Sequence, residues 1–251
     1  MAPWEAARWD VITEGVGMIR KFWAMLLALG VTLAISLGVT FGAAPGLAMA
    51  DEAETSKVNG SINIGSGEHK GNLSTVNGSI HVGTQATVGH VNTVNGGLSV
   101  DSGATAGALT TVNGSINVRD GAHVQGNINS VNGSLHVEQD ADVTGNLTNV
   151  NGSIRVAAAH VGGSIGTYNG NIDLGPNAHI DGNVHIEKDH SWHFGFWNTP
   201  PVPHVVVEPG TVVRGKLRFE REVKLYVSDR ATIGPVEGAE VVKFSGDHPP
   251  E

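Results

Sequence analysis

Cysteine is absent from this chain, aromatic residues make up only 5% of it and charged residues only 16%. Without cysteine there is no disulfide framework, no thiolate zinc site and no cysteine to carry a lipid. A soluble domain usually has about a quarter of charged residues, whereas here small residues dominate, with 35 glycines among 251 residues. The hydrophobic share of 40% still suffices for a core. We therefore expect a folded chain whose stability comes from packing alone.

A helical fold and a nucleic-acid partner are both disfavoured. β-Branched residues and glycines crowd every segment and no 3.6-residue period appears, which excludes helices as the main element. The formal net charge is −9, and an acidic surface repels phosphate backbones within a Debye length of about 10 Å.

The first 50 residues have the pattern of an export signal. Arg20 and Lys21 precede an apolar run over residues 22–41, and Ala48-Met49-Ala50 supplies small residues for cleavage. We expect residues 1–50 to be a signal peptide removed after Ala50. The alternative is an uncleaved N-terminal membrane anchor, because about twenty apolar residues can span a bilayer. Both versions place the chain from residue 51 onward outside the cytoplasm, in the periplasm or at the cell surface.

A short motif, Val-Asn-Gly-Ser-Ile or a variant of it, recurs along the chain at an interval that varies by no more than one position. A near-fixed period this short indicates solenoid coils rather than domains. A finer six-residue period predicts three sides per coil, and residues alternating by two predict strands with one buried face. The expected fold is all-β, a single-stranded, three-sided, right-handed parallel β-helix (β-solenoid) with coils of about 18 residues. The motifs begin at Val58, Val76, Val94, Val112, Val131, Val150 and Tyr168.

Three aliphatic positions of each coil are expected to stack into interior ladders, because equivalent residues of adjacent coils lie about 4.8 Å apart. The first is the motif valine, the second the Ile or Leu four residues later, and the third the aliphatic residue three before the valine. Each fully buried side chain contributes about 1.5–3 kcal/mol. The ladders are Val58, Val76, Val94, Val112, Val131 and Val150; Ile62, Ile80, Leu98, Ile116, Leu135, Ile154 and Ile172; and Leu73, Val91, Leu109, Ile128, Leu147, Ile165 and Val184.

Asn-Gly follows the motif valine in every copy, which predicts a corner, since both residues tolerate a left-handed backbone. Stacked asparagine amides can hydrogen-bond along the axis, as in cross-β structure. We therefore expect a structural asparagine ladder. Five corners read Asn-Gly-Ser and match the glycosylation pattern, but a repeat that needs Asn-Gly for geometry produces this match by accident. The ladder consists of Asn59, Asn77, Asn95, Asn113, Asn132, Asn151 and Asn169.

Regular coils are expected over residues 51–187, and the pattern then breaks. We expect residues 188–204 to form a loop ejected from one corner, residues 205–245 to form the final coils and residues 246–251 to be a polar tail. About nine coils would give a rod on the order of 45 Å long. Four aromatic residues in the loop form a candidate contact surface, because they are costly to leave in water; packing against a lateral face is the alternative. They are Trp192, Phe194, Phe196 and Trp197.

No catalytic constellation emerges. Polysaccharide lyases and hydrolases with parallel β-helices need carboxylates grouped on one face, and the carboxylates here fall at varied phases of the coil. A six-residue period also describes the left-handed helix of hexapeptide acyltransferases, but bulky Ile62, Ile80 and Ile116 stand where those enzymes favour small residues. We therefore expect no enzymatic activity and no cofactor.

Metal binding is not expected either. A zinc site needs three or four converging ligands, and His185, Glu187 and their acidic and histidine neighbours in residues 189–193 match no such spacing. Glu138, Asp140 and Asp142 alternate along one segment and could hold a hard cation weakly, but we interpret them as a solvated strand face.

The Val-Asn-Gly-Ser-Ile coils, together with Ala-His-Ile-Asp-Gly-Asn-Val at 178–184 and Ala-Thr-Ile-Gly-Pro-Val at 231–236, resemble two related groups of bacterial β-solenoids. One is the bactofilins, or polymer-forming cytoskeletal proteins; the other is an adhesin-like domain family of exported or membrane-anchored proteins. The resemblance covers residues 56–245. It implies right-handed three-sided helices, and for bactofilins end-to-end polymers on the cytoplasmic side. The export-like N-terminus departs from the bactofilins and favours the adhesin-like group.

Together these features predict an exported, non-catalytic structural or adhesion-type β-solenoid of the bacterial cell envelope. Its expected partners are further copies of itself, joined end to end, or an envelope polysaccharide or protein. Nucleic acid is not expected, and membrane contact is expected only through an uncleaved N-terminal segment. The alternative is a carbohydrate-binding or carbohydrate-active β-helix of the envelope with its site in loop 188–204.

Overall fold

The computed structural model describes residues 54–188 and 201–249. The expected signal segment 1–50 and the four aromatic residues of the candidate contact loop lie outside the described residues. Within the described residues the chain forms strands and turns only, so none of them forms a helix that could cross a membrane. The all-β prediction is confirmed.

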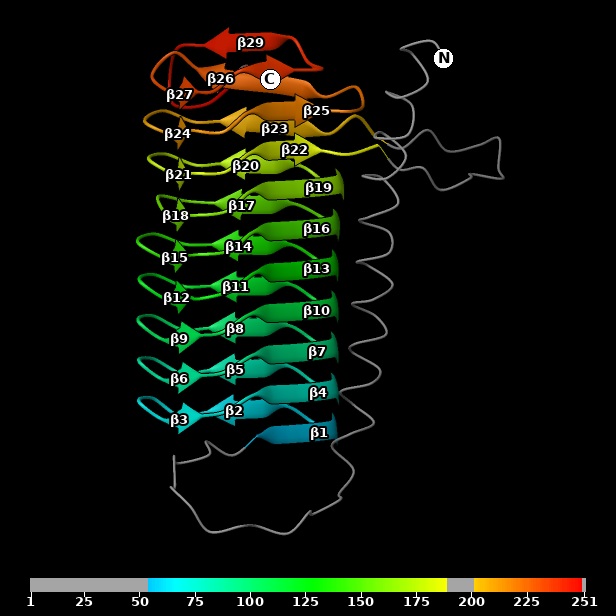
Figure 1. Ribbon diagram of the computed structural model, residues 1–251, viewed down its shortest axis with the longest axis vertical. Helices are drawn as coiled ribbons and strands as arrows, with labels where there is room; N and C mark the ends of the chain where they lie inside the picture. The colour runs from blue at the N-terminus through cyan, green and yellow to red at the C-terminus, as the bar shows by residue number, and fades with distance from the viewer. Residues whose placement is uncertain (1–53, 189–200, 250–251) are drawn as a thin grey trace, which may run out of the picture. The chain divides into compact units, whose positions relative to one another are not determined.

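Three parallel sheets run along the solenoid axis, and successive strands of one coil pass to successive sheets (Figure 1). Sheet A begins with strands of five residues, TSKVN to IGTYN, and becomes shorter toward the C-terminal end. Its strands, in order of pairing, are β1 (Thr55–Asn59), β4 (Leu73–Asn77), β7 (Val91–Asn95), β10 (Leu109–Asn113), β13 (Ile128–Asn132), β16 (Leu147–Asn151), β19 (Ile165–Asn169), β22 (Val184–Ile186), β25 (Leu217–Phe219) and β28 (Val236–Glu237).

Sheets B and C complete the triangle. Sheet B contains β2 (Ile62–Ile64), β5 (Ile80–Val82), β8 (Leu98–Val100), β11 (Ile116–Val118), β14 (Leu135–Val137), β17 (Ile154–Val156), β20 (Ile172–Leu174), β23 (His204–Val207), β26 (Lys224–Ser228) and β29 (Val241–Phe244). Sheet C contains β3 (His69–Lys70), β6 (Thr87–Val88), β9 (Thr105–Ala106), β12 (His123–Val124), β15 (Asp142–Val143), β18 (His160–Val161), β21 (His179–Ile180), β24 (Val212–Val213) and β27 (Thr232–Ile233).

The described residues make about ten turns, one more than the nine expected, because sheets A and B each have ten strands. The coil resumes in register after the break in the pattern, since Ile172 of β20 pairs directly with Val205 of β23. The residues between β22 and β23 therefore connect sheet A to sheet B, as the Asn-Gly corners do in the earlier coils, and β23 continues the ladder of sheet B.

Two of the three expected aliphatic ladders form the core. The Ile and Leu ladder of sheet B from Ile62 to Ile172 and the ladder of sheet A from Leu73 to Val184 are both almost completely buried. Alanines and valines of sheet C, such as Ala106 and Val124, fill the third side. This interior is dominated by aliphatic side chains, so their burial is the main stabilisation.

The valine ladder was predicted wrongly, because these valines point outward. The strands of sheet A start at the buried Leu73 position, so alternation places Thr75 inside and Val76 outside. Val58 is 58% exposed. The prediction of an interior valine used a six-residue spacing, which relates positions on two different sheets. Such a spacing does not show which face of its own strand a residue occupies.

Threonines occupy the interior position that the valines were expected to fill. Thr75, Thr93 and Thr111 are at most 1% exposed. Each hydroxyl donates to the carbonyl of a corner glycine in the preceding coil, an oxygen that would be costly to bury without a donor. The bonds run from Thr75 Oγ1 to the Gly60 oxygen (3.2 Å), from Thr93 to Gly78 (3.0 Å) and from Thr111 to Gly96 (3.1 Å).

Glycine is required at the Asn-Gly corner by the stacking itself. A Cβ added at Gly96 would collide with the carbonyl of Gly78 directly below, and one at Gly114 would collide with that of Gly96. Only a residue without a side chain lets the corners approach this closely. The repeated glycine is therefore a steric consequence of the coil spacing.

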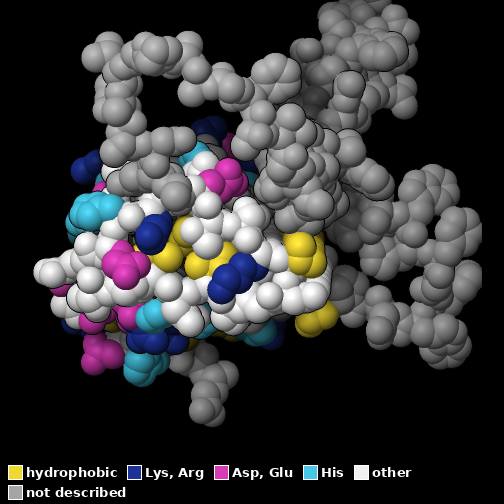
Figure 2. Space-filling view, turned by 90° about the horizontal axis from the view of Figure 1, so that it is seen from below, with side chains coloured by type: hydrophobic (Ala, Val, Ile, Leu, Met, Phe, Trp, Pro, Cys, Tyr) yellow, Lys and Arg dark blue, Asp and Glu magenta, His cyan; other side chains and the backbone are white. Residues whose placement is uncertain are grey.

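Lysines occupy interior positions in the first and last coils. Lys57 is in register with the buried Thr75, Lys70 with Val88, and Lys243 with Val227. The ammonium of Lys57 donates to the backbone oxygen of Ser61 at 2.8 Å. Viewed from below, the first coil shows apolar side chains with lysine or arginine among them (Figure 2). Inward-pointing charges of this kind discourage further strand pairing at a sheet edge.

Candidate functional site

The three lateral faces of the solenoid differ in charge. From β1 to β19, no outward-facing residue of sheet A is charged. Sheets B and C instead carry ion pairs: on sheet B, Asp101 lies 3.1 Å from His81 and 3.3 Å from Arg119. We call the outward surface of β1 to β19 the neutral face.

The neutral face consists of three parallel columns. Hydroxyl and amide side chains form one edge, the valines form the centre and the asparagines form the corner. Except for Val58, the valines are half-buried, because each is covered by the valines above and below it. The central column is Val58, Val76, Val94, Val112, Val131 and Val150, followed by Tyr168.

The seven expected ladder asparagines are joined by six side-chain hydrogen bonds. In each, the amide nitrogen donates to the Oδ1 atom of the asparagine one coil below. At the C-terminal end the column stops at Asn169, whose Oδ1 accepts a hydrogen bond of 2.9 Å from the guanidinium of Arg221. The donors and distances are Asn77 (3.0 Å), Asn95 (2.9 Å), Asn113 (2.9 Å), Asn132 (3.0 Å), Asn151 (2.9 Å) and Asn169 (3.3 Å).

Sheet C carries a column of histidine and aspartate. Register places His123, Asp142 and His160 on successive strands. His160 Nδ1 lies 2.5 Å from Asp142 and Nε2 lies 3.1 Å from Asp181, which also receives a 2.6 Å hydrogen bond from Arg214. Both ring nitrogens face carboxylates, so the hydrogen bonds that the ring donates to Asp142 and, to a lesser extent, to Asp181 raise the pKa of His160. The same contact with His160 lowers the pKa of Asp181.

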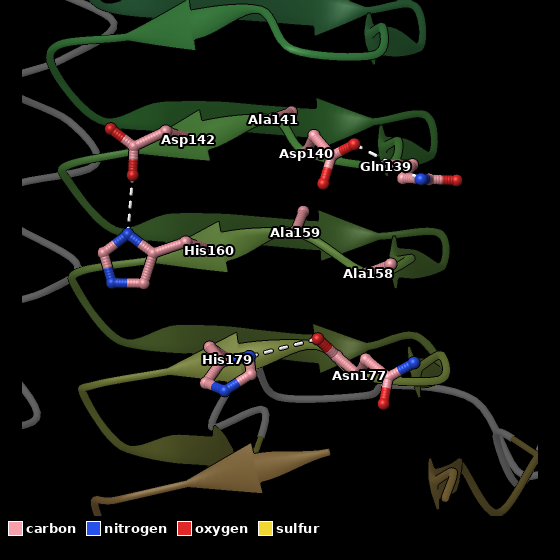
Figure 3. Close-up of a pocket in the computed structure, with 9 residues that line it drawn as sticks. All are labelled: Gln139, Asp140, Ala141, Asp142, Ala158, Ala159, His160, Asn177 and His179. Atoms are coloured by element: carbon pink, nitrogen blue, oxygen red, sulfur yellow. Dashed lines mark hydrogen bonds and ion pairs between the residues drawn. The ribbon is translucent and has the colours of Figure 1, made fainter. Parts of the chain in front are cut away.

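A shallow hollow of about 440 Å³ lies beside this column (Figure 3). The turn before β18 has three residues, Ala157 to Ala159, whereas the turns before β15 and β21 have four. In the described chain the Asp140 amide bonds the Ala158 oxygen, but the Ala158 amide has no such bond to the turn above. The missing residue opens the hollow, which is lined by Gln139, Asp140, Ala141, Asp142, Ala158, Ala159, His160, Asn177 and His179.

These turns also impose a left-handed backbone. Asp140, Ala158 and Asn177 have φ values of 57°, 46° and 58°. Aspartate and asparagine tolerate this region, whereas alanine gains nothing to offset the strain. Ala158 is thus the strained residue of the hollow.

The candidate metal ligands of the described residues lie in two separate places on the solenoid. Glu138, Asp140 and Asp142 do not share one strand as expected, because Glu138 and Asp140 lie in the turn before β15 and only Asp142 lies in that strand. Asp140 and Asp142 line the hollow and Glu138 does not. Residues 54–188 and 201–249 contain no group of three or more His, Asp or Glu side chains placed to hold a metal ion. His185 Nε2 lies 3.7 Å from Glu187 Oε1, and burial lowers the pKa of His185. The other members of that cluster lie outside the described residues.

Sequence reasoning missed both lateral features. The neutral face was missed because its valines were predicted to lie inside. The hollow was missed because a turn shortened by one residue is inconspicuous in a repeat whose interval already varies by one. The interval from Asp142 to His160 is one position shorter than the interval from Val137 to Val156, and this difference is the signal that locates the shortened turn. Comparison with known proteins adds no family to this β-solenoid, since no family model, no curated protein and no solved structure matches the chain.

Proposed function

We propose that the chain is an exported structural or adhesion-type β-solenoid of the bacterial cell envelope and that it binds an envelope partner through the neutral face of sheet A. The observation that carries this proposal is the absence of charge on the outward side of β1 to β19 in a chain of net charge −9. Membership of the exported adhesin-like group is part of the proposal and rests on the repeated motif and the export-like first 50 residues.

The physical case begins with desolvation. Binding to a charged surface requires that ions lose water, which costs several kcal/mol per ion when pairing is imperfect. The neutral face presents valine methyl groups beside asparagine amides that already bond to one another. Such a surface can be covered without stripping a charge of its water.

The size of the neutral face suits a modest contact. Seven strands at about 4.8 Å by five residues at about 3.3 Å give a flat area on the order of 500 Å². A standard stable interface covers about 800 Å² per partner. The face therefore supports a weak attachment by one molecule, strengthened where several copies act together on one surface.

The lysines of the terminal coils favour lateral binding over end-to-end assembly. A second copy stacked on the first coil would have to cover Lys57 and Lys70 at interior positions. Burial of an unpaired ammonium is strongly unfavourable. Of the expected partners, an envelope polysaccharide or protein is therefore preferred over a chain of identical copies.

Cosedimentation of the full chain with isolated envelope fractions tests the proposal. Val112→Lys places a charge in the centre of the neutral face, and Asn117→Lys places the same charge on sheet B of the same coil. Both positions are half-buried and point outward. We expect Val112→Lys to weaken binding about tenfold, the equivalent of about 1.4 kcal/mol, with Asn117→Lys unchanged. Equal binding by both variants would refute the neutral face as the contact surface.

Carbohydrate binding is the second candidate, and the hollow on sheet C favours it. Its rim of carboxylate, amide and imidazole groups around an alanine floor offers the polar groups that fix orientation in small-molecule sites. A screen of bacterial polysaccharides with wild type and Asn177→Ala decides this point. Binding lost in the variant, or turnover of any glycan, would place the activity at the hollow instead of the neutral face.

A further inference from the structure

The last Asn-Gly pair of the ladder differs from those below it. The amide of Asn169 makes the longest bond of the column, 3.3 Å to Asn151. Its Oδ1 accepts a hydrogen bond from the guanidinium of Arg221, which also lies 3.3 Å from the oxygen of Pro201. Arg221 is half-buried and is held by several oxygens, so its charge stays directed at the Asn169 side chain.

The backbone after Asn169 is also less constrained. In the five lower corners the glycine amide donates to the carbonyl oxygen of the asparagine one coil above. Within the described residues the amides of Gly152 and Gly170 make no such bond. In the coil above Asn169, the chain between β22 and β23 has no Asn-Gly pair. The five bonds are Gly60 to Asn77 (2.8 Å), Gly78 to Asn95 (3.0 Å), Gly96 to Asn113 (3.0 Å), Gly114 to Asn132 (2.9 Å) and Gly133 to Asn151 (3.0 Å).

Both differences bear on one reaction of Asn-Gly sequences. The glycine nitrogen attacks Cγ of the asparagine side chain and loses its proton to solvent, the new C–N bond closes a succinimide ring, and the side-chain nitrogen leaves as ammonia. Water then opens the ring to aspartate or isoaspartate. A glycine amide held in a hydrogen bond resists the attack, and a cation at Oδ1 stabilises the negative charge that develops on that oxygen. Arginine remains charged at every relevant pH.

We propose that Asn169 is a site of spontaneous deamidation in the folded protein, and that Arg221 promotes the reaction and then pairs with the aspartate formed. The Gly170 amide is free to attack, whereas Gly96 and Gly114 are tied to the next coil. Arg221 contacts the oxygen on which charge accumulates. The product carboxylate converts the hydrogen bond from the Arg221 cation to a neutral amide into an ion pair with hydrogen bonding, which offsets the loss of the Asn169 to Asn151 bond.

The reaction adds one negative charge at the upper end of the neutral face. This inference stands on the local geometry of Asn169, Gly170 and Arg221 and does not depend on the proposed envelope function. If the envelope function holds as well, aged protein would present a face with one charged end.

Peptide mapping by mass spectrometry tests the inference on the full chain, incubated at mildly alkaline pH in water enriched in heavy oxygen. The internal comparison is Asn95 and Asn113, which have the same Asn-Gly sequence with a bonded glycine amide. We expect label to enter at position 169 about tenfold faster than at these two positions. In denaturant, where the fold no longer distinguishes the corners, the rates at the three positions should converge.

Two variants separate chemistry from unfolding. Arg221→Gln keeps a hydrogen-bond donor but removes the cation, and we expect it to slow the reaction at Asn169 without changing the rate at Asn95. Asn169→Asp mimics the product and should retain the thermal midpoint of the wild type through its pair with Arg221. Equal rates along the whole column, or an unchanged rate at Asn169 in Arg221→Gln, would overturn the inference.

Discussion

The buried threonine column allows the same substitution to be tested at two equivalent positions with opposite expected results. Thr111 is fully buried and its hydroxyl donates to the oxygen of Gly96 at 3.1 Å. Thr167 is 2% exposed, and its Oγ1 is the one buried side-chain polar atom of the described residues without a hydrogen-bond partner. Replacing either with valine exchanges a hydroxyl for a methyl group of nearly the same shape.

The reason for the difference lies one coil below Thr167. In the lower coils the equivalent hydroxyl bonds the glycine oxygen one coil below, which for Thr167 is the oxygen of Gly152. In that lower coil, however, the interior position in register with Thr167 is occupied by Asn149. The longer amide of Asn149 donates both to Gly133 at 2.8 Å and to Gly152 at 2.9 Å. The Gly152 oxygen is therefore already satisfied, and the hydroxyl of Thr167 is buried without compensation.

The expected magnitudes follow from these contacts. Thr111→Val leaves the Gly96 carbonyl without its donor, so we expect a loss of about 1–2 kcal/mol in the free energy of unfolding. Thr167→Val removes an unsatisfied hydroxyl, so we expect a gain of about 1 kcal/mol. Both residues lie in interior coils, which pack against a coil on each side. A change in the stability of such a coil therefore affects both neighbouring coils and alters the cooperative unfolding transition.

Urea denaturation followed by circular dichroism measures both free energies, with the slope of the transition as a check on the denatured state. An equal loss in both variants would show that the threonine hydroxyls contribute through packing rather than through hydrogen bonds. It would refute the assignment of Thr167 as unsatisfied.

Three further predictions concern sheet C and the corners. Ala158→Gly relieves a left-handed backbone and should stabilise the protein by about 0.5–1 kcal/mol in the same assay; a loss would mean that φ at this turn carries no strain. Gly114→Ala should destabilise by about 1–3 kcal/mol because its Cβ meets the carbonyl below, whereas Gly97→Ala, with only a 3.3 Å contact, should be much milder. Because the folded-state pKa of His160 is raised, its contribution is complete below the ordinary histidine pKa and is lost as pH rises through the raised value. His160→Gln should flatten this part of the stability profile measured by thermal unfolding, and an unchanged profile would contradict the assignment.

Much of the fold was predictable from the sequence, because a solenoid repeats its signal in every coil. The ladders that begin at Ile62 and Leu73 are interior as expected. The error at Val76 arose because the six-residue spacing was counted across two sheets: counted by twos from Leu73 within one strand, Thr75 is inside and Val76 outside. Valine is usually buried in preference to threonine. Here the threonine is buried and the valine faces outward, because the carbonyl of the corner glycine needs a hydrogen-bond donor. The right-handed sense of the coil stays a prediction.

The candidate site was less predictable, for a physical reason. The neutral face and the hollow are properties of residues brought together from successive coils, and each depends on which side of the strand a residue occupies. The contacts of His160 reach Asp142 in the coil below and Asp181 in the coil above. Neither contact corresponds to a local motif, so only the register of the strands reveals the column.

The asparagine column has a polarity that resembles that of an α-helix. Every amide nitrogen points toward the N-terminal end and every Oδ1 toward the C-terminal end, from Asn59 to Asn169. Their dipoles therefore add along the axis, as peptide dipoles do in a helix, with the negative end at Asn169. Arg221 at that end takes the place of the basic residues that favour a helix C-terminus. The asparagine column thus has a positive end and a negative end. The guanidinium of Arg221, from a later coil, neutralises the negative end at Asn169.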